Sequence, residues 1–171
     1  MFLIPHPLAP HGATRSIEVH AWQDAERWHV RYLVEGIDQI ILPNPADAGR
    51  AEDLWRTTCF ELFVADKASA YREFNFSPSH QWAAYSFQGH REGMREAPAA
   101  VEVWLDFGED WIAVEVAVEA HLVADARVGL SAVIAQKDGS KSYWALAHPP
   151  GAPDFHHEDC FAATLPSIGA P

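Results

Sequence analysis

The feature that most constrains the fold of this chain is a strict alternation of residues between positions 57 and 64. One face carries Thr58, Phe60, Leu62 and Val64, and the other carries Thr57, Cys59, Glu61 and Phe63. A repeat of two residues indicates a β-strand. The same repeat returns after a polar turn at residues 66–69, where Phe74 and Phe76 alternate with Glu73, Asn75 and Ser77. We therefore predict a hairpin with one buried phenylalanine face and one more polar face.

Short strand patterns of this kind recur along the chain. The other predicted strands lie at residues 16–22, 28–35, 37–42, 81–87, 101–107, 112–118, 128–135, 142–147 and 160–165. The 12 prolines and 10 glycines interrupt the sequence too often for long helices, and one helical turn is expected within residues 119–126. Because a parallel sheet needs crossover helices, the pattern predicts an all-β fold: a two-sheet antiparallel β-sandwich of immunoglobulin-like or jelly-roll-like type.

Composition narrows the range of partners. No repeat or long linker divides the sequence, so we expect a single domain over residues 1–171, with residues 1–14 as an extended lead-in. The net charge of −12 would repel a phosphate backbone, which argues against nucleic acid and anionic membranes as partners. The apolar start is too short for a secretory signal. We therefore expect a cytoplasmic protein in which Cys59 and Cys160 are thiols, and we leave a homodimer open.

The polar face of the predicted hairpin is the first candidate site. A turn centred near residue 68 places Glu61 near Asn75 and Phe63 near Glu73, with opposed side chains about 5 Å apart. Aromatic residues flank this row, namely Trp55, Trp82 and Tyr85. Carboxylate and amide groups accept hydrogen bonds from sugar hydroxyls, while an aromatic ring packs on the C–H face of a sugar. The alternative is an ordinary solvated outer face, which antiparallel sheets often have.

Arg56 stands at the entry to the first strand of this hairpin, next to Trp55. Its guanidinium group could hold a carboxylate, either from a ligand or from Glu61 or Glu73. The alternative is a structural ion pair that fixes the loop. The sequence does not decide between these two roles.

Histidine, acidic residues and a cysteine gather near the C-terminus, at His148, His156, His157 and Cys160. These residue types ligate zinc, but without a pair of cysteines the spacing matches no structural zinc pattern. Haem ligation by one of the histidines is a related hypothesis. The alternative is a proline-shaped loop in which polar side chains cap strand ends. We expect no obligatory cofactor and keep haem or a metal ion as an open alternative.

Catalysis has two candidate arrangements in this sequence. Glu61 and Glu73 could form the acid and base of a small hydrolase, as in glycoside hydrolysis. A cysteine could pair with His148 or His156 as nucleophile and base. Neither arrangement has a local motif, since no G-x-S-x-G, phosphate-binding loop or G-x-G-x-x-G occurs. The sequence therefore favours a non-catalytic ligand-binding module over an enzyme, with a protein-interaction domain as a further alternative.

Several segments together resemble a known family. They are LWRTTCFELFV at residues 54–64, YREFNFSPS at 71–79, QWAAY at 81–85, YWALAH at 143–148 and PDFH at 153–156. These segments are similar to bacterial DOMON-like domain proteins over about residues 15–165. The resemblance implies a β-sandwich related to DOMON domains and to family-nine carbohydrate-binding modules, which bind haem or sugars against one sheet. The candidate pocket residues that it implies are Trp55, Arg56, Glu61, Glu73, Asn75, Trp82 and Trp144.

The haem-binding relatives use a methionine and a histidine as ligands. The only internal methionine of this chain, Met94, falls in a predicted loop, so that ligand pair has no clear equivalent here. The resemblance therefore favours a saccharide or a similar small polar ligand.

Overall fold

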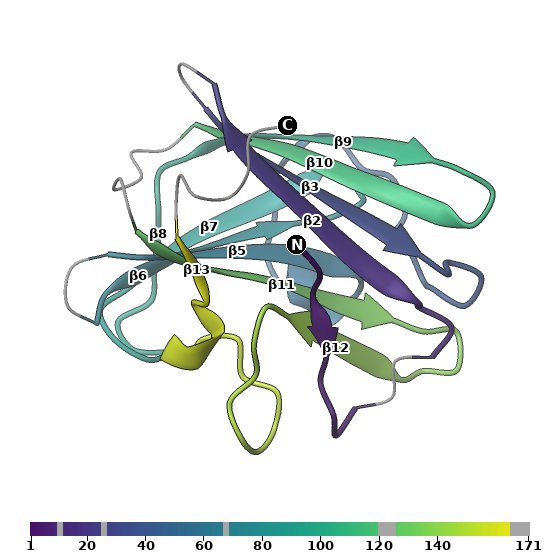
Figure 1. Cartoon of the computed structure of the whole chain (residues 1–171). Coiled ribbons are helices and arrows are strands. Elements are labelled where there is room, and N and C mark those ends of the chain that lie inside the picture. Colours follow the sequence, from purple (N-terminus) through teal and green to yellow (C-terminus); the bar gives the residue numbers. More distant parts are fainter. Residues whose placement is uncertain (10–11, 25–26, 67–68, 120–125, 165–171) are drawn as a thin grey trace.

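The computed structural model describes residues 1–9, 12–24, 27–66, 69–119 and 126–164. These residues form two β-sheets packed face to face, with almost all strands antiparallel (Figure 1). The predicted all-β sandwich is therefore confirmed. Within the described residues, no helix is long and apolar enough to cross a membrane.

The larger sheet follows the order β1-β12-β11-β5-β6-β7-β4. Its strands are β1 (Ile4–Pro5), β12 (Lys141–Ala145), β11 (Arg127–Ala135), β5 (Cys59–Ala65), β6 (Tyr71–Phe76), β7 (Gln81–Phe87) and β4 (Gly49–Arg50). Two short strands extend it, β13 (Ala163–Thr164) beside β11 and β8 (Arg95–Glu96) beside β7. The short pairing of β4 with β7 is parallel.

The smaller sheet follows the order β2-β3-β10-β9. Its strands are β2 (Ser16–Gln23), β3 (Trp28–Glu35), β10 (Trp111–Glu119) and β9 (Ala100–Phe107). Two short 3₁₀ helices complete the described elements, η1 (Leu54–Arg56) before β5 and η2 (Glu158–Cys160) before β13. Nine of the predicted strands are present, as β2, β3, β5, β6, β7, β9, β10, β11 and β12, and their ends agree with the prediction to within two residues.

The main core lies between the two sheets. The predicted inward set Phe60, Leu62, Phe74 and Phe76 is buried there, against residues such as Val30 and Val114 of the smaller sheet. The Tyr32 hydroxyl of β3 donates a 2.7 Å hydrogen bond to the Glu61 carbonyl of β5, which links the sheets through the core. The predicted register is also confirmed, because Glu61 pairs with Asn75 and Phe63 with Glu73.

Some of the strand predictions were wrong. Residues 37–42 form no strand, and only Ile40 makes a single bridge, to Gln136. The predicted lead-in contains β1, which pairs with β12, and the predicted loop at 43–53 contains β4. At the predicted strand 160–165, Cys160 ends η2 and, among the described residues 160–164, strand pairing is limited to Ala163 and Thr164. Residue 165 lies outside the described part of the chain. Of the helical turn expected in 119–126, residues 120–125 lie outside the described part of the chain.

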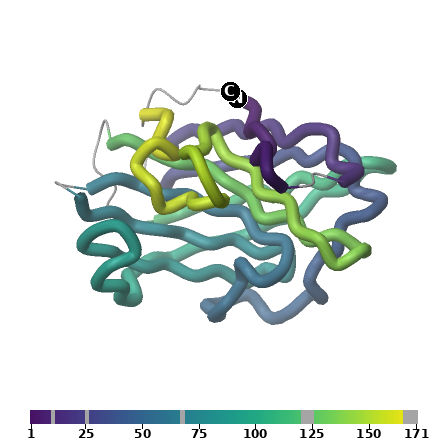
Figure 2. Tube along the Cα trace, turned by 90° about the horizontal axis from the view of Figure 1, so that it is seen from below, coloured from purple at the N-terminus to yellow at the C-terminus, as the bar shows by residue number. Residues whose placement is uncertain are grey.

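The outer face of the larger sheet carries a second apolar cluster beneath the C-terminal segment. Figure 2 shows this yellow segment crossing in front of the strands of that sheet. Phe161 of the segment packs on Phe63 and Tyr71, and Phe155 packs on Tyr143. At Gly129 of β11 an added Cβ would lie 2.8 Å from the Phe161 ring, so glycine allows the close approach. This segment therefore covers part of the polar row and leaves the rest accessible.

Candidate functional site

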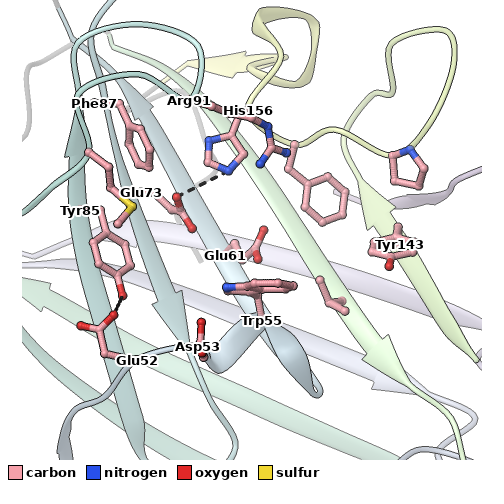
Figure 3. A pocket seen from close by; sticks show the side chains of 14 residues that line it. Glu52, Asp53, Trp55, Glu61, Glu73, Tyr85, Phe87, Arg91, Tyr143 and His156 are labelled. Atoms are coloured by element: carbon pink, nitrogen blue, oxygen red, sulfur yellow. Dashed lines mark hydrogen bonds and ion pairs between the residues drawn. The ribbon is translucent and has the colours of Figure 1, made fainter. Parts of the chain in front are cut away.

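A cavity of about 450 Å³ lies on the outer face of the larger sheet. Strands β5, β6, β7, β11 and β12, the segment around η1, the loop after β7 and the C-terminal segment all contribute to it. The residues that line it are Glu52, Asp53, Trp55, Glu61, Glu73, Tyr85, Phe87, Arg91, Met94, Val133, Tyr143, Pro153, Phe155 and His156. Figure 3 shows the two carboxyl groups of Glu61 and Glu73 on the sheet, with rings placed around them.

Glu61 is 4% exposed and stands at the centre of the sheet. Its Oε2 accepts a 2.9 Å hydrogen bond from the Ser131 hydroxyl of the neighbouring strand β11. Burial, followed by the negative charge of Glu73, raises the pKa of Glu61 to about 8, although Ser131 and Arg91 oppose the shift. The pair of Glu61 and Glu73 therefore holds a proton at neutral pH in the absence of a ligand.

Glu73 is 6% exposed and lies on the adjacent strand β6. Its Oε1 accepts a 2.7 Å hydrogen bond from the Asn75 side-chain amide. Burial raises the pKa of Glu73 above the usual value of a carboxyl group, and the Asn75 hydrogen bond opposes that shift. The floor of the cavity thus combines two buried carboxyl groups that disfavour each other's ionisation.

His156 of the C-terminal segment points at Glu73, with Nε2 3.7 Å from Oε2 (Figure 3). Its Nδ1 lies 2.7 Å from the Tyr71 hydroxyl, which also accepts the Arg91 backbone N–H. Because a hydroxyl has one proton to donate, this network favours Tyr71 as donor to Nδ1 and places the imidazole proton on Nε2. Burial, helped by the charge of Arg91, lowers the pKa of His156 to about 4, so the ring is neutral at pH 7.

Trp55 and the segment that precedes it form one wall. Trp55 belongs to η1, which packs on β5, β6 and β7, and its side chain is 50% exposed. Asp53 adopts a left-handed φ of 58° at the start of η1 and bonds Arg56 at 3.0 Å. Asp and Asn tolerate this conformation better than most residues, so Asp53 turns the chain and presents the indole at the cavity mouth.

Tyr85 of β7 forms the wall opposite the C-terminal segment. Its hydroxyl donates a 3.0 Å hydrogen bond to Glu52 Oε2. Burial, followed by this bond to a carboxylate, raises the pKa of Tyr85 to about 12. The phenol is therefore a fixed, neutral group whose position depends on Glu52.

The loop after β7 is tied to the C-terminal segment by Asp154. The Asp154 carboxylate accepts hydrogen bonds from Arg91 at 2.8 Å and from His90 at 2.7 Å. These contacts hold the two segments together at the cavity edge. The charge of Arg91 is thereby matched by Asp154 at the rim, while the carboxyl groups on the floor have no such partner.

The structure brings together only some of the predicted site residues. Trp55, Glu61 and Glu73 line the cavity, whereas Asn75 is buried beneath it, where it positions Glu73 and contacts the Cys59 thiol. Burial, with the charge of Glu61, raises the pKa of that thiol well above its usual value. Arg56 is exposed and paired with Asp53, which corresponds to the structural alternative.

Trp82 and Trp144 lie on the opposite face of the sheet from the cavity. Trp82 pairs with Phe76, and Trp144 pairs with Ala132, so the alternation turns both rings toward the main core. The Trp144 indole N–H donates to Ser142 inside the protein. Their predicted place in the pocket is therefore corrected.

The side chains of the three histidines proposed as metal ligands do not converge on one point. His148 contacts the Ile4 carbonyl at 2.9 Å beside β1. His157 accepts the Asp159 backbone N–H and caps η2, while His156 faces Glu73. Across the described residues, no group of three His, Cys, Asp or Glu side chains is placed to hold a metal ion. Haem or metal binding remains a hypothesis from the sequence alone.

Most of the residues that form the walls of the cavity were not predicted from the sequence. Phe87, Arg91, Met94, Tyr143 and Phe155 line the cavity but were not predicted there. Phe87 and Tyr143 could have been found from alternation, since they share faces with Tyr85 and with Val133, respectively. Arg91, Met94 and Phe155 stand on loops, whose positions no periodic pattern reveals.

The fold and the cavity define an antiparallel β-sandwich with a ligand-sized hollow on the outer face of one sheet. A solved structure from Bacteroides uniformis ATCC 8492, described as a "putative carbohydrate-binding protein", has the same fold with a TM-score of 0.55. The match has 14% sequence identity and covers 84% of this chain and 75% of the other. No model of a known family matches the sequence, and no curated protein matches it.

Proposed function

We propose that this protein is a non-catalytic module that binds a saccharide or a similar small polar ligand in the outer-face cavity. The observation that carries the proposal is the pairing of two buried carboxyl groups, Glu61 and Glu73, with aromatic rings that line the same hollow, of which Trp55 is exposed. Buried acceptors with unused capacity are costly unless a ligand supplies donors. Aromatic rings beside them provide the apolar surface that the C–H face of a sugar covers.

The size and surroundings of the cavity support this reading. Ligand pockets usually enclose about 300–1,000 Å³, and this one has about 450 Å³. The likeness to the Bacteroides protein supports it through the fold. We further infer a distant relationship to DOMON domains and family-nine carbohydrate-binding modules, on the strength of the quoted segments around Glu61 and Glu73.

A saccharide panel tests the proposal by thermal shift and isothermal titration calorimetry. A ligand at about 100 times its Kd should stabilise the protein by about 2.7 kcal/mol. Trp55→Ala should weaken binding, because Trp55 forms the cavity mouth. Trp104→Ala is the matched control, since Trp104 is an exposed tryptophan (43%) on β9 of the other sheet. If no saccharide binds, or if both variants weaken binding equally, the proposal is wrong.

A second candidate function is a small hydrolase that uses Glu61 and Glu73. The observation that favours it is the raised pKa of Glu61, about 8, which keeps this carboxyl protonated and able to act as a general acid near neutral pH. Aryl glycosides serve as substrates for the test. Glu61→Gln should abolish turnover while leaving the binding of a neutral sugar in place. Absence of turnover across the panel would leave the binding function alone.

A further inference from the structure

The charges around the cavity are strongly unbalanced. Four carboxyl groups line it, those of Glu52, Asp53, Glu61 and Glu73, against one guanidinium group, that of Arg91. His156 does not add a cation, because burial lowers its pKa to about 4. A ligand that enters this hollow therefore meets acidic groups on the floor and on one wall.

The nearby arginines pair with carboxylates at the rim and not with the two carboxyl groups on the floor. Arg91 pairs with Asp154 at 2.8 Å, and Arg56 pairs with Asp53 at 3.0 Å. The Lys141 ammonium lies 5.8 Å from the Trp55 ring. Among the described residues, Glu61 has no ion-pair partner, and Glu73 has only the neutral His156 at 3.7 Å.

Glu61 supplies a second observation that points to a ligand. The residue is 96% buried, counted from its 4% exposure, yet it lines the cavity. Its Oε2 is satisfied by Ser131, whereas Oε1 has no hydrogen-bond partner in the part of the chain that the structure describes. A buried acceptor that faces a hollow and lacks a partner invites a donor from outside.

We propose that the ligand is an amino sugar whose primary ammonium group binds between Glu61 and Glu73. This inference rests on the saccharide function proposed above and names the chemical class of the ligand. An ammonium group brings three N–H donors and a positive charge, so it donates to the unpaired oxygen and stabilises both carboxyl groups in their ionised forms. A neutral hydroxyl supplies a donor but no charge, so it does not favour ionisation of the pair. The rings of Tyr85, Phe87 and Phe155 then surround a cation and its C–H neighbours.

Binding of an ammonium group would be coupled to proton release. Without a ligand Glu61 is protonated at about pH 6.5, because its pKa is about 8. The ammonium group favours the ionised carboxylate, so the Glu61 proton passes to the buffer. The charged and titratable groups that line the cavity with Glu61 are Glu73 on β6, Tyr85 on β7, Arg91 after β7, Tyr143 on β12, His156 on the C-terminal segment, and Glu52 and Asp53 before η1. A neutral sugar would release no proton.

The experiment uses matched triplets on the full chain at about pH 6.5. Each triplet contains an amino sugar, its parent sugar and its N-acetyl derivative, in the gluco, galacto and manno series. Calorimetry in two buffers of different ionisation enthalpy gives affinity and proton release together. For at least one series we expect the amino sugar to bind about tenfold more tightly than the parent sugar, with release of up to one proton. The N-acetyl derivative should lose this advantage.

Single substitutions test whether Glu61 and Glu73 are responsible for the preference for the amino sugar. Glu61→Gln and Glu73→Gln should each remove the preference for the amino sugar, and Glu61→Gln should also abolish proton release. Glu109→Gln is the control, because Glu109 is an exposed acid in the turn between β9 and β10 of the other sheet. Equal affinity for amino and parent sugars would overturn the ammonium inference and leave saccharide binding intact. Absence of binding by every sugar would overturn both. Equal loss in Glu109→Gln would show general charge attraction and overturn the assigned site.

Discussion

The two faces of strands β5 and β6 are built from alternate residues of the same segments, yet they have opposite characters. Toward the smaller sheet, Phe60 and Phe74 are completely buried among apolar side chains. Toward the cavity, Glu61 and Glu73 are almost as deeply buried, but as ionisable groups. Burial of the phenylalanine rings stabilises the fold, at about 25 cal/mol per Å² of apolar surface. Burial of the two carboxyl groups opposes their ionisation and lowers stability near neutral pH.

This contrast indicates that the two faces of one sheet have different roles. The inner face supplies the stability that allows the outer face to retain two poorly compensated acids. Groups that lower stability in the free protein are those from which a bound ligand can gain most. If this is correct, truncation of a core phenylalanine should lower stability and neutralisation of a buried acid should raise it.

The largest expected effect is on the inner face. Phe74→Ala should lower the free energy of unfolding by about 4 kcal/mol, because it opens a cavity in a core that small shifts cannot refill. Chemical denaturation measures this loss. The control is Phe107→Ala, since Phe107 is exposed at the end of β9 and should change stability by less than about 0.5 kcal/mol. Equal effects would contradict the assignment of the core.

On the outer face, Glu61→Gln should stabilise the free protein by about 3 kcal/mol at pH 7. The pKa of Glu61 is about 8 in the folded state and 4.5 in the reference state, so folding at pH 7 must offset about 2.5 pKa units of unfavourable protonation. The isosteric amide keeps the Ser131 hydrogen bond and carries no ionisation cost. Denaturation at pH 7 measures the gain. A loss of stability would mean that the carboxyl contributes to the fold as well as to the cavity.

The pH dependence separates the contribution of Glu61 from that of His156 on the outer face. Glu61 has a raised pKa, so its contribution is present below pH 4.5 and is lost as the pH rises to about 8. His156 has a lowered pKa, so its contribution is present above pH 6.5 and is lost as the pH falls to about 4. Between pH 4.5 and 6.5 the two slopes oppose each other, each about 1.4 kcal/mol per pH unit.

Glu61→Gln should therefore change the shape of the stability curve. The variant should lose about 1.4 kcal/mol per unit as the pH falls from 6.5 toward 4.5, where the parent protein is nearly flat. Above pH 6.5 the parent should lose stability and the variant should lose much less. Denaturation series at half-unit steps measure both curves. Parallel curves would show that Glu61 titrates near its ordinary pKa.

The periodic part of this molecule could be predicted from the sequence, and the irregular part could not. Alternation at Phe60, Glu61 and Leu62 fixes which residues face the core, because a strand turns every second side chain to the same side. The turn predicted near residue 68 gave the register that pairs Glu61 with Asn75. The same rule, applied to Trp82 through its pairing with Phe76, places that ring in the core, but the start of its strand after Pro78 was not fixed by the sequence.

The walls of the cavity depend on contacts between distant segments. Asp154 joins Arg91 across more than sixty positions, and Phe161 lies against Gly129 and Phe63 because the C-terminal segment folds back over the sheet. Such contacts leave no periodic trace in the sequence. The short strands β1 and β4 were not predicted for a related reason, since two paired residues are too few to show alternation.

The smallest expected change in stability concerns Trp55, at the mouth of the cavity. Trp55 is half exposed, and its ring contacts the side chains of Arg56 and Lys141 at 5.5 and 5.8 Å. Cation–π contacts at exposed sites are worth about 0.5–1 kcal/mol, so Trp55→Ala should lower the free energy of unfolding by at most about 1 kcal/mol. Denaturation of the unliganded variant measures this, with Trp104→Ala as the matched exposed tryptophan. A loss as large as that of Phe74→Ala would place Trp55 in the structural core and remove it from the binding face, because a ring kept for a ligand contributes little to the fold that carries it.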